Sequence, residues 1–354
     1  MFRKWIGTSR YVYNRCLSEV KKGEEINFFS LRNKYVTSKN NYNVESWELE
    51  TPKDIRAGAI QDLVAGYKTS MSNLKAGNIN SFNLRFRKKK EVKSIRLPSS
   101  CLKKNENLKS IYIYKTYTKQ KIKVSKDKSL NYDIEHDFRL QNKNGKWFIC
   151  IPIKKETNKE VENNDVCSLD PGIINFQTIY SNKEIITIKV NRELQEKLRK
   201  KLDLLSSLRS KKEIKYRNYI QSRNKIYNKM NNQINELHNK TINYLVRNYK
   251  TIIIPTFENQ EIVGKLKSKK NKRELLSLQH YSFKHRLQEK SKTIRGCSVI
   301  ETTEEYTSKT CSSCGKIQEI KNKRTYNCEN CNLEIDRDVN GSRCIMIKTI
   351  MEMT

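Results

Sequence analysis

Two pairs of cysteines near the carboxyl end of the sequence have the spacing of a metal site. Cys311 and Cys314 form a CSSC pair, Cys328 and Cys331 form a CENC pair, and residues 315–327 separate them. Four thiolates from two such turns provide the closed tetrahedral set that binds a structural zinc ion. A closed set has no position for substrate, so we expect this zinc to organise the fold while other groups do the chemistry. The alternative is four unliganded thiols.

Two further segments place carboxylates where chemistry is expected. Asp170, in CSLDPG, ends an expected strand before a turn, and Asp336 and Asp338, in DRDVN, precede an expected helix over 341–351. Hydrolysis of a phosphodiester by two divalent cations, about 4 Å apart, needs carboxylates that converge from different elements. Asp170 and Asp338 suit that task. The alternative is that each acid caps a turn or a helix, which is a common role of Asp.

The sequence is strongly basic. Its 354 residues include 72 Lys and Arg against 38 Asp and Glu, a formal net charge of +34. A folded chain with this excess repels itself unless a polyanion shares its surface, so nucleic acid is the expected partner. No run approaches the roughly 18 apolar residues of a membrane span, and the start lacks a signal-peptide core. We therefore expect a soluble intracellular protein without a membrane partner, in the nucleus if the source is eukaryotic or viral and in the cytoplasm if it is prokaryotic.

The hydrophobic pattern changes along the chain. Helical spacing dominates the start, whereas short alternating runs between about 82 and 155 indicate a small β domain. Three strands in a meander are expected between 166 and 190, followed by two long helices with basic faces and by buried strands at 251–254 and 297–303. The basic faces could line a nucleic-acid channel or could belong to a solvated coiled coil.

A basic segment at the entrance of the β domain interleaves aromatic and cationic residues. Its sequence is FNLRFRKKK, as a surface that grips phosphates and stacks bases would require. The alternative is a solvated basic face. The candidate nucleic-acid-binding residues are Arg85, Arg87, Lys88, Lys89 and Lys90.

The order of these motifs resembles a known family. A strand ending in DPG, long helices, a hydrophobic strand, TSKTCSSCG, a second CxxC and DRDVN are similar to the transposon-encoded TnpB nucleases and their eukaryotic and viral relatives, the Fanzor proteins. The resemblance covers nearly the whole chain and is strongest over 166–345. It implies an RNA-guided DNA endonuclease with an RNase H-like (RuvC) α/β domain and an inserted zinc ribbon, preceded by a helical bundle and a small β-barrel-like domain.

The resemblance also implies domain boundaries. They are a helical recognition region at 1–80, a β-rich wedge-type domain at 81–160, a RuvC-like nuclease domain at 161–305 with long basic helices at 192–250, the zinc ribbon at 306–335 and a C-terminal RuvC segment at 336–354.

One position departs from the TnpB pattern. Where TnpB has a catalytic Glu at the end of the hydrophobic strand, this sequence has Pro255, which can bind no metal. Fanzor proteins resemble this sequence in having a Pro there and a relocated Glu just before Tyr-Thr-Ser, and Glu304 is the best match to it. The other candidates for this ligand are Glu258, Glu301 and Glu305.

The resemblance therefore implies that Asp170, Glu304 and Asp338 hold two Mg²⁺ ions and that Asp336 is a weaker alternative to Asp338. A guide RNA and a target DNA are the implied partners, with cleavage of double-stranded DNA beside a short adjacent motif. A catalytically impaired RNA-guided DNA-binding protein, which lost cleavage with the acid at Pro255, is the second hypothesis.

Overall fold

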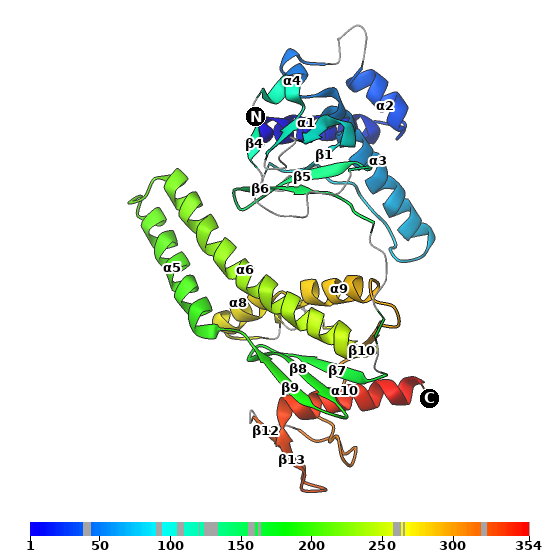
Figure 1. Ribbon diagram of the computed structural model, residues 1–354, viewed down its shortest axis with the longest axis vertical. Helices are drawn as coiled ribbons and strands as arrows, with labels where there is room; N and C mark the ends of the chain where they lie inside the picture. Colours follow the sequence, from blue (N-terminus) through cyan, green and yellow to red (C-terminus); the bar gives the residue numbers. More distant parts are fainter. Residues whose placement is uncertain are drawn as a thin grey trace. The chain divides into compact units, whose positions relative to one another are not determined.

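The structure is a computed structural model that describes residues 1–37, 44–89, 94–104, 110–119, 121–123, 134–154, 160–161, 164–257, 263–264, 266–319 and 324–353. The chain divides into two compact units, Met1–Lys154 and Lys155–Thr354, each with its own hydrophobic core (Figure 1). Among the described helices, none is long and apolar enough to cross a membrane. Two residues singled out in the sequence, Lys90 and Glu258, lie outside the described residues.

The N-terminal unit begins with helices whose apolar faces pack on one another. They are α1 (Phe2–Lys21), α2 (Phe28–Tyr35) and α3 (Lys53–Lys75), and a 3₁₀ turn (Ser46–Glu50) precedes α3. Leu17, Leu31 and Ile60 are fully buried between the helices. The side chain of Asn27 caps α2 by accepting hydrogen bonds from the backbone N–H groups of Phe29 and Ser30.

The described strands of this unit form two antiparallel sheets. One sheet contains β1 (Ser94–Leu97), β5 (Phe138–Lys143) and β6 (Lys146–Cys150), and the other contains β2 (Leu102–Lys104), β3 (Ser110–Ile113) and β4 (Ile122–Lys123). A short 3₁₀ turn (Ser99–Cys101) connects β1 to β2, and the short helix α4 (Lys115–Thr118) lies between β3 and β4. Trp5 of α1 and Ile55 of α3 belong to the same core as the strands. The helical and β-rich segments therefore form one compact unit.

A five-stranded mixed sheet forms the centre of the C-terminal unit. Its strands are β7 (Val166–Pro171), β8 (Asn175–Ser181), β9 (Ile185–Lys189), β10 (Thr251–Pro255) and β11 (Ser298–Thr302), in the order β11-β10-β7-β8-β9. The first three form the predicted antiparallel meander, and β10 and β11 run parallel to β7. This order and these directions are those of an RNase H-like domain, so the predicted fold class is confirmed.

Helices cover both faces of this sheet (Figure 1). The chain forms α5 (Arg192–Ser210) and α6 (Tyr216–Asn248) before β10, α8 (Lys269–Leu278) and α9 (His280–Ser291) before β11, and α10 (Arg337–Met353) at the end. Cys167 and Leu169 of β7 pack in the core that α6 and α9 cover. Side chains alternate along a strand, so Ser168 and Asp170 face the other side. There the Ser168 hydroxyl donates a 2.7 Å hydrogen bond to the carbonyl of Ser342 in α10.

The zinc-ribbon segment connects β11 to α10. It contains the antiparallel pair β12 (Thr325–Asn327) and β13 (Glu334–Asp336). Helix α10 begins directly after β13, at Arg337, so the expectation that the helix begins at 341 was wrong. The acidic segment DRDVN starts the helix instead of preceding it, because Asp336 caps the first turn.

Candidate active site and metal centre

Asp170 lies at the carboxyl end of β7, on the sheet face that α10 covers. The residue is half-buried, and an ideal Cβ built on Gly341 of α10 would lie 2.8 Å from Asp170 Oδ2. Burial raises the pKa of Asp170 well above its ordinary value, and the carboxylates of Asp338 and Glu304 raise it further. A carboxylate crowded by other acids is stabilised by a cation, which is the environment of a metal ligand.

Asp336 and Asp338, on either side of the start of α10, have different roles. Asp338 Oδ2 accepts a 2.6 Å hydrogen bond from Nδ2 of Asn175, at the start of β8. Asp336 is exposed, and its Oδ1 accepts hydrogen bonds from the backbone N–H groups of Asp338 (2.8 Å) and Val339 (3.4 Å). Asp336 therefore caps the helix, whereas Asp338 projects toward the sheet.

The strand next to Pro255 brings an acid to the same edge of the sheet. Pro255 ends β10, and its neighbour on the parallel strand β11 is Thr302. Glu304 follows two residues later and is half-buried. Because β10 and β11 are parallel, Glu304 lies at the same edge of the sheet as Asp170, and its charge contributes to the raised pKa of Asp170.

The other candidate glutamates have different surroundings. Glu301 lies on β11 and forms a 2.7 Å ion pair with Lys284 of α9. Glu305 is exposed in the turn after Glu304. The fourth candidate, Glu258, is outside the described residues.

The sheet topology brings these acids to one edge of the sheet. The strands β7, β10 and β11 are parallel, so their carboxyl ends meet at one edge. Asp170 comes from the strand β7, Glu304 from the loop after β11 and Asp338 from the helix α10. Three carboxylates from three elements offer the hard oxygen ligands that Mg²⁺ prefers.

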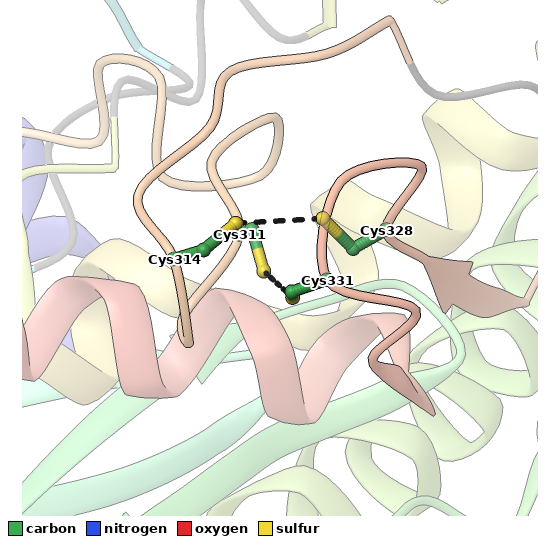
Figure 2. Close-up of side chains that lie close together, drawn as sticks. All are labelled: Cys311, Cys314, Cys328 and Cys331. Atoms are coloured by element: carbon green, nitrogen blue, oxygen red, sulfur yellow. Dashed lines mark hydrogen bonds between the residues drawn. The ribbon is translucent and has the colours of Figure 1, made fainter.

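The four predicted cysteines also come together (Figure 2). The Sγ atoms of Cys311 and Cys331 are 3.6 Å apart, those of Cys314 and Cys328 are 3.6 Å apart, and all four lie within 4.8 Å of one another. Tetrahedral thiolates at a Zn–S distance of about 2.3 Å would be about 3.8 Å apart. The cluster therefore has the size needed to hold one metal ion.

The backbone of both cysteine turns favours thiolates. Gly315 (φ +74°) and Asn332 (φ +55°) adopt the left-handed conformation that closes each turn after its second cysteine. Backbone hydrogen bonding at Lys316 lowers the pKa of Cys314 to about 6, and backbone hydrogen bonding at Cys331 lowers the pKa of Cys328, whereas burial and the neighbouring cysteines raise the pKa of Cys331 to about 11. Thiolates are the form that binds metal.

Asn340 connects this cysteine cluster to the helix of Asp338. The side chain is fully buried; its Nδ2 donates a 2.8 Å hydrogen bond to the carbonyl of Thr310, and its Oδ1 accepts a 3.0 Å hydrogen bond from the backbone N–H of Ser312. The Cys344 thiol lies 3.2 Å from the same Thr310 carbonyl. The first cysteine turn is therefore attached to α10 within one helical turn of Asp338.

The basic segment of the N-terminal unit is extended and lies along α1 and α3. Arg87 contacts two residues of its own unit. Its guanidinium lies 3.8 Å from the ring centroid of Tyr13, and its Nη2 is 3.2 Å from Asp62 Oδ2. Arg85, Lys88 and Lys89 are exposed.

Sequence reasoning did not single out Asn175, Gly341 or the role of Asn340. Asn175 and Gly341 lie five and three residues from predicted acids, but nothing in a single sequence distinguishes an asparagine that contacts a carboxylate from one in a turn. A Gly just inside an acidic helix start was the available signal for a close backbone approach.

Two family models match the C-terminal unit and the residues just before it. Residues 148–263 match the model described as "Probable transposase" (OrfB of IS605), and residues 280–345 match the model described as "Cas12f1-like, TNB domain". The second match contains the cysteine cluster, Glu304 and Asp338.

Viral proteins that are similar to most of this chain carry related names. A TnpB-like protein of Acanthamoeba polyphaga mimivirus is 30% identical over 302 residues, which cover 80% of this chain and 55% of that protein. A protein of Paramecium bursaria Chlorella virus 1 that is named as a transposase is 26% identical over 366 residues, covering 98% of this chain and 83% of that protein. This chain thus spans only about half the length of the mimivirus relatives.

A solved structure of a Cas12f1–sgRNA–target DNA complex is also similar. It matches with a TM-score of 0.40 and 16% identity over 97% of this chain and 93% of that chain. The family models and the viral relatives agree with one another, and the chain belongs to the TnpB family of transposon-encoded proteins.

Proposed function

We propose that this protein is an RNA-guided, Mg²⁺-dependent endonuclease that cleaves double-stranded DNA beside a short adjacent motif and is associated with a mobile element. The proposal is supported by the positions of Asp170, Glu304 and Asp338 at one edge of an RNase H-like sheet and by the raised pKa of Asp170, to which the charges of the other two acids contribute. Membership of the TnpB family supports RNA guidance, because the family resemblance implies target choice by guide pairing.

In this proposal Asp170, Glu304 and Asp338 are the protein ligands of two Mg²⁺ ions. Mg²⁺ ions held by these residues would activate a water and stabilise the departing oxygen of the phosphodiester. The protein holds the ligands in place. The missing Cβ of Gly341 lets α10 approach Asp170, and the cap formed by Asp336 fixes the helix turn that carries Asp338.

The proposed metal of the cysteine cluster is a structural Zn²⁺. The sulfur spacing, the lowered pKa of Cys314 and the soft thiolate set all support it. Because all four ligands are protein thiolates, this ion takes no part in the reaction.

The helical hairpin of α5 and α6 is proposed to bind nucleic acid. Between 209 and 229 the sequence has eight Lys and Arg residues and a single acid, Glu213. Tyr216 is 60% exposed and Tyr227 is 42% exposed, and the Arg209 guanidinium lies over the Tyr216 ring. Exposed aromatic rings among cations stack bases and bind phosphates, which supports contact with guide RNA or the guide–target duplex.

The basic segment of the N-terminal unit is proposed as a second contact. Arg85, Lys88 and Lys89 are exposed, Lys90 continues the same run, and Arg87 helps to fix the segment on its own unit. These groups would bind the RNA backbone without reading its sequence.

The combination of Pro255 and Glu304 supports a Fanzor-like assignment within the family. An acid that moves from the end of β10 to the loop after the adjacent parallel strand stays at the same edge of the sheet. This is the arrangement that the resemblance to Fanzor proteins implies.

A catalytically impaired RNA-guided DNA-binding protein is the second candidate. The observation that favours it is Pro255, since the usual ligand position at the end of β10 has no carboxylate. Both candidates predict RNA and DNA binding. They differ in cleavage.

The test is a plasmid-cleavage assay with the protein and its co-purified RNA, sequenced to define a matching target. We expect Mg²⁺-dependent double-strand cleavage by the wild-type protein and none by the Asp170→Ala variant, with guide binding equal in both. Wild-type protein that binds guide and target but never cuts would establish the second candidate, and a lack of bound RNA would exclude both.

A further inference from the structure

Asn175 forms a hydrogen bond with Asp338, one of the proposed metal ligands. Its Nδ2 donates a 2.6 Å hydrogen bond to Asp338 Oδ2, and the residue is only 3% exposed. The amide orientation follows from this contact, because the amide oxygen would repel a carboxylate whereas the amide nitrogen donates to it. Asn175 Oδ1 must therefore point away from Asp338.

An irregularity in β8 brings Asn175 to this face of the sheet. Thr178 pairs with Asp170, and paired residues project to the same face, so Thr178 faces α10. Strict alternation from Thr178 would place Asn175, three residues earlier, on the opposite face. The pairing of β8 with β9 shifts register between Asn175 and Gln177, which is a β-bulge. The bulge places Phe176 in the core under α6 and α9 and aims Asn175 at Asp338.

Two buried oxygen atoms on this face lack protein partners. Asn175 Oδ1 and Thr178 Oγ1 are buried and have no hydrogen-bond partner in the part of the chain that the structure describes. A buried polar atom without a partner destabilises the folded protein and commonly marks the place of a water or an ion. Both atoms belong to residues that contact or pair with proposed metal ligands, Asp338 and Asp170.

We infer that Asn175 is a positioning residue of the metal site: its amide N–H fixes the Asp338 carboxylate, and its amide oxygen accepts a hydrogen bond from a water on the bound divalent cation. The inference rests on the proposed function, since it assumes that Asp338 is a metal ligand. Thr178 provides a second acceptor on the same face. Partners of this kind orient metal ligands, and their loss typically weakens metal binding about 10- to 100-fold.

The experiment measures Mn²⁺ binding by electron paramagnetic resonance, with the zinc-loaded full-length protein freed of nucleic acid. We expect Asn175→Ala to weaken binding at the carboxylate site about 10- to 100-fold. The matched control is Asn248→Ala. This variant also removes one side-chain hydrogen bond, from Asn248 Nδ2 to the carbonyl of Tyr244 (2.8 Å). Asn248 lies beside the start of β10, at the other end of the sheet from Asn175. Asp170→Ala identifies the signal that belongs to the carboxylate site.

Each outcome has a separate meaning. Wild-type Mn²⁺ affinity in Asn175→Ala, with or without a lower melting temperature, would show a merely structural residue and overturn the inference while leaving the proposed function intact. Wild-type protein with no site that Asp170→Ala removes would overturn both.

If Asn175→Ala does not fold, a crystal structure of the Mn²⁺-bound wild-type protein decides the matter. We expect Nδ2 on Asp338 and Oδ1 within hydrogen-bond distance of a metal-bound water. An amide turned away from both would overturn the inference.

Discussion

Gly341 and Asp170 are so close that no side chain fits between them. An ideal Cβ on Gly341 would lie 2.8 Å from Asp170 Oδ2 and 3.4 Å from its Cγ. A side chain at residue 341 would therefore force the Asp170 carboxylate or helix α10 to shift. The spacing of two proposed ligands depends on this contact.

Replacing Gly341 by Ala should lower cleavage by about 100-fold or more, because the Asp170 carboxylate or the helix must move. Stability should change little, since Ala favours a helix over Gly by about 1 kcal/mol and offsets part of the crowding. Single-turnover cleavage and urea unfolding measure the two effects. Gly66→Ala in α3 is the control, because no heavy atom lies within 4 Å of its ideal Cβ, and it should leave cleavage unchanged. Full activity of Gly341→Ala would contradict the close contact.

Glu304→Gln should reduce cleavage by about 100-fold or more, because a neutral amide is a poor ligand for Mg²⁺. Glu301→Gln and Glu305→Gln should stay within about threefold of wild type, since Glu301 is paired with Lys284 and Glu305 is exposed. Cleavage rates at several Mg²⁺ concentrations provide the comparison. Retained cleavage by Glu304→Gln, with a loss in either of the other two variants, would reassign the ligand.

Loss of zinc should impair cleavage although zinc does not take part in the reaction. Asn340 joins the first cysteine turn to α10, so an unfolded ribbon would free the helix start that carries Asp338. We expect Cys328→Ser to lower both the zinc content and cleavage, by about 10-fold or more. Cys150→Ser, at an exposed cysteine outside the cluster, should change neither. Normal cutting by a stably zinc-free protein would contradict this prediction.

The two buried histidines of the C-terminal unit should destabilise it as the pH falls below about 6.5, whereas Asp170, whose pKa is raised, acts in the opposite sense. Burial lowers the pKa of His238 to about 4 and that of His280 to about 3, from an ordinary value of 6.5. Between those values the unfolded chain binds protons that the folded protein does not, so acid favours unfolding, by about 1.4 kcal/mol for each pH unit and histidine. The stabilisation is therefore complete above pH 6.5 and is lost toward pH 4.

Urea unfolding at pH 7 and pH 5 measures this effect. Each of the two histidines should contribute a loss of about 2 kcal/mol over this interval, which the difference between the wild type and a histidine variant isolates. Phe176 is stacked between the two imidazole rings, so His280→Phe keeps an aromatic ring in the stack. This variant should lose about half of the pH dependence. An unchanged pH dependence in His280→Phe would show that His280 titrates normally in the folded protein.

Much of this protein could be predicted from local patterns in its sequence. The cysteine turns depend on residues within five positions of one another, and the meander at 166–190 depends on alternation within short strands. Such features are decided by nearby residues, and the structure contains them as predicted. The start of α10 was predicted four residues too late. The sequence does not show whether the helix begins directly after Asp336, which caps it, or only at Gly341.

The tertiary structure alone decided which distant groups meet. Glu304 reaches the neighbourhood of Asp170 because β11 lies beside β10 in parallel, and Asn175 reaches Asp338 because of a bulge in β8. Strand order and a one-residue register shift depend on the packing of the whole sheet, which no local spacing encodes. The sequence by itself thus determined the ribbon, the family and the candidate acids, whereas the position of those acids at one edge, with Gly341 against Asp170 and Asn175 bonded to Asp338, is a property of the folded sheet.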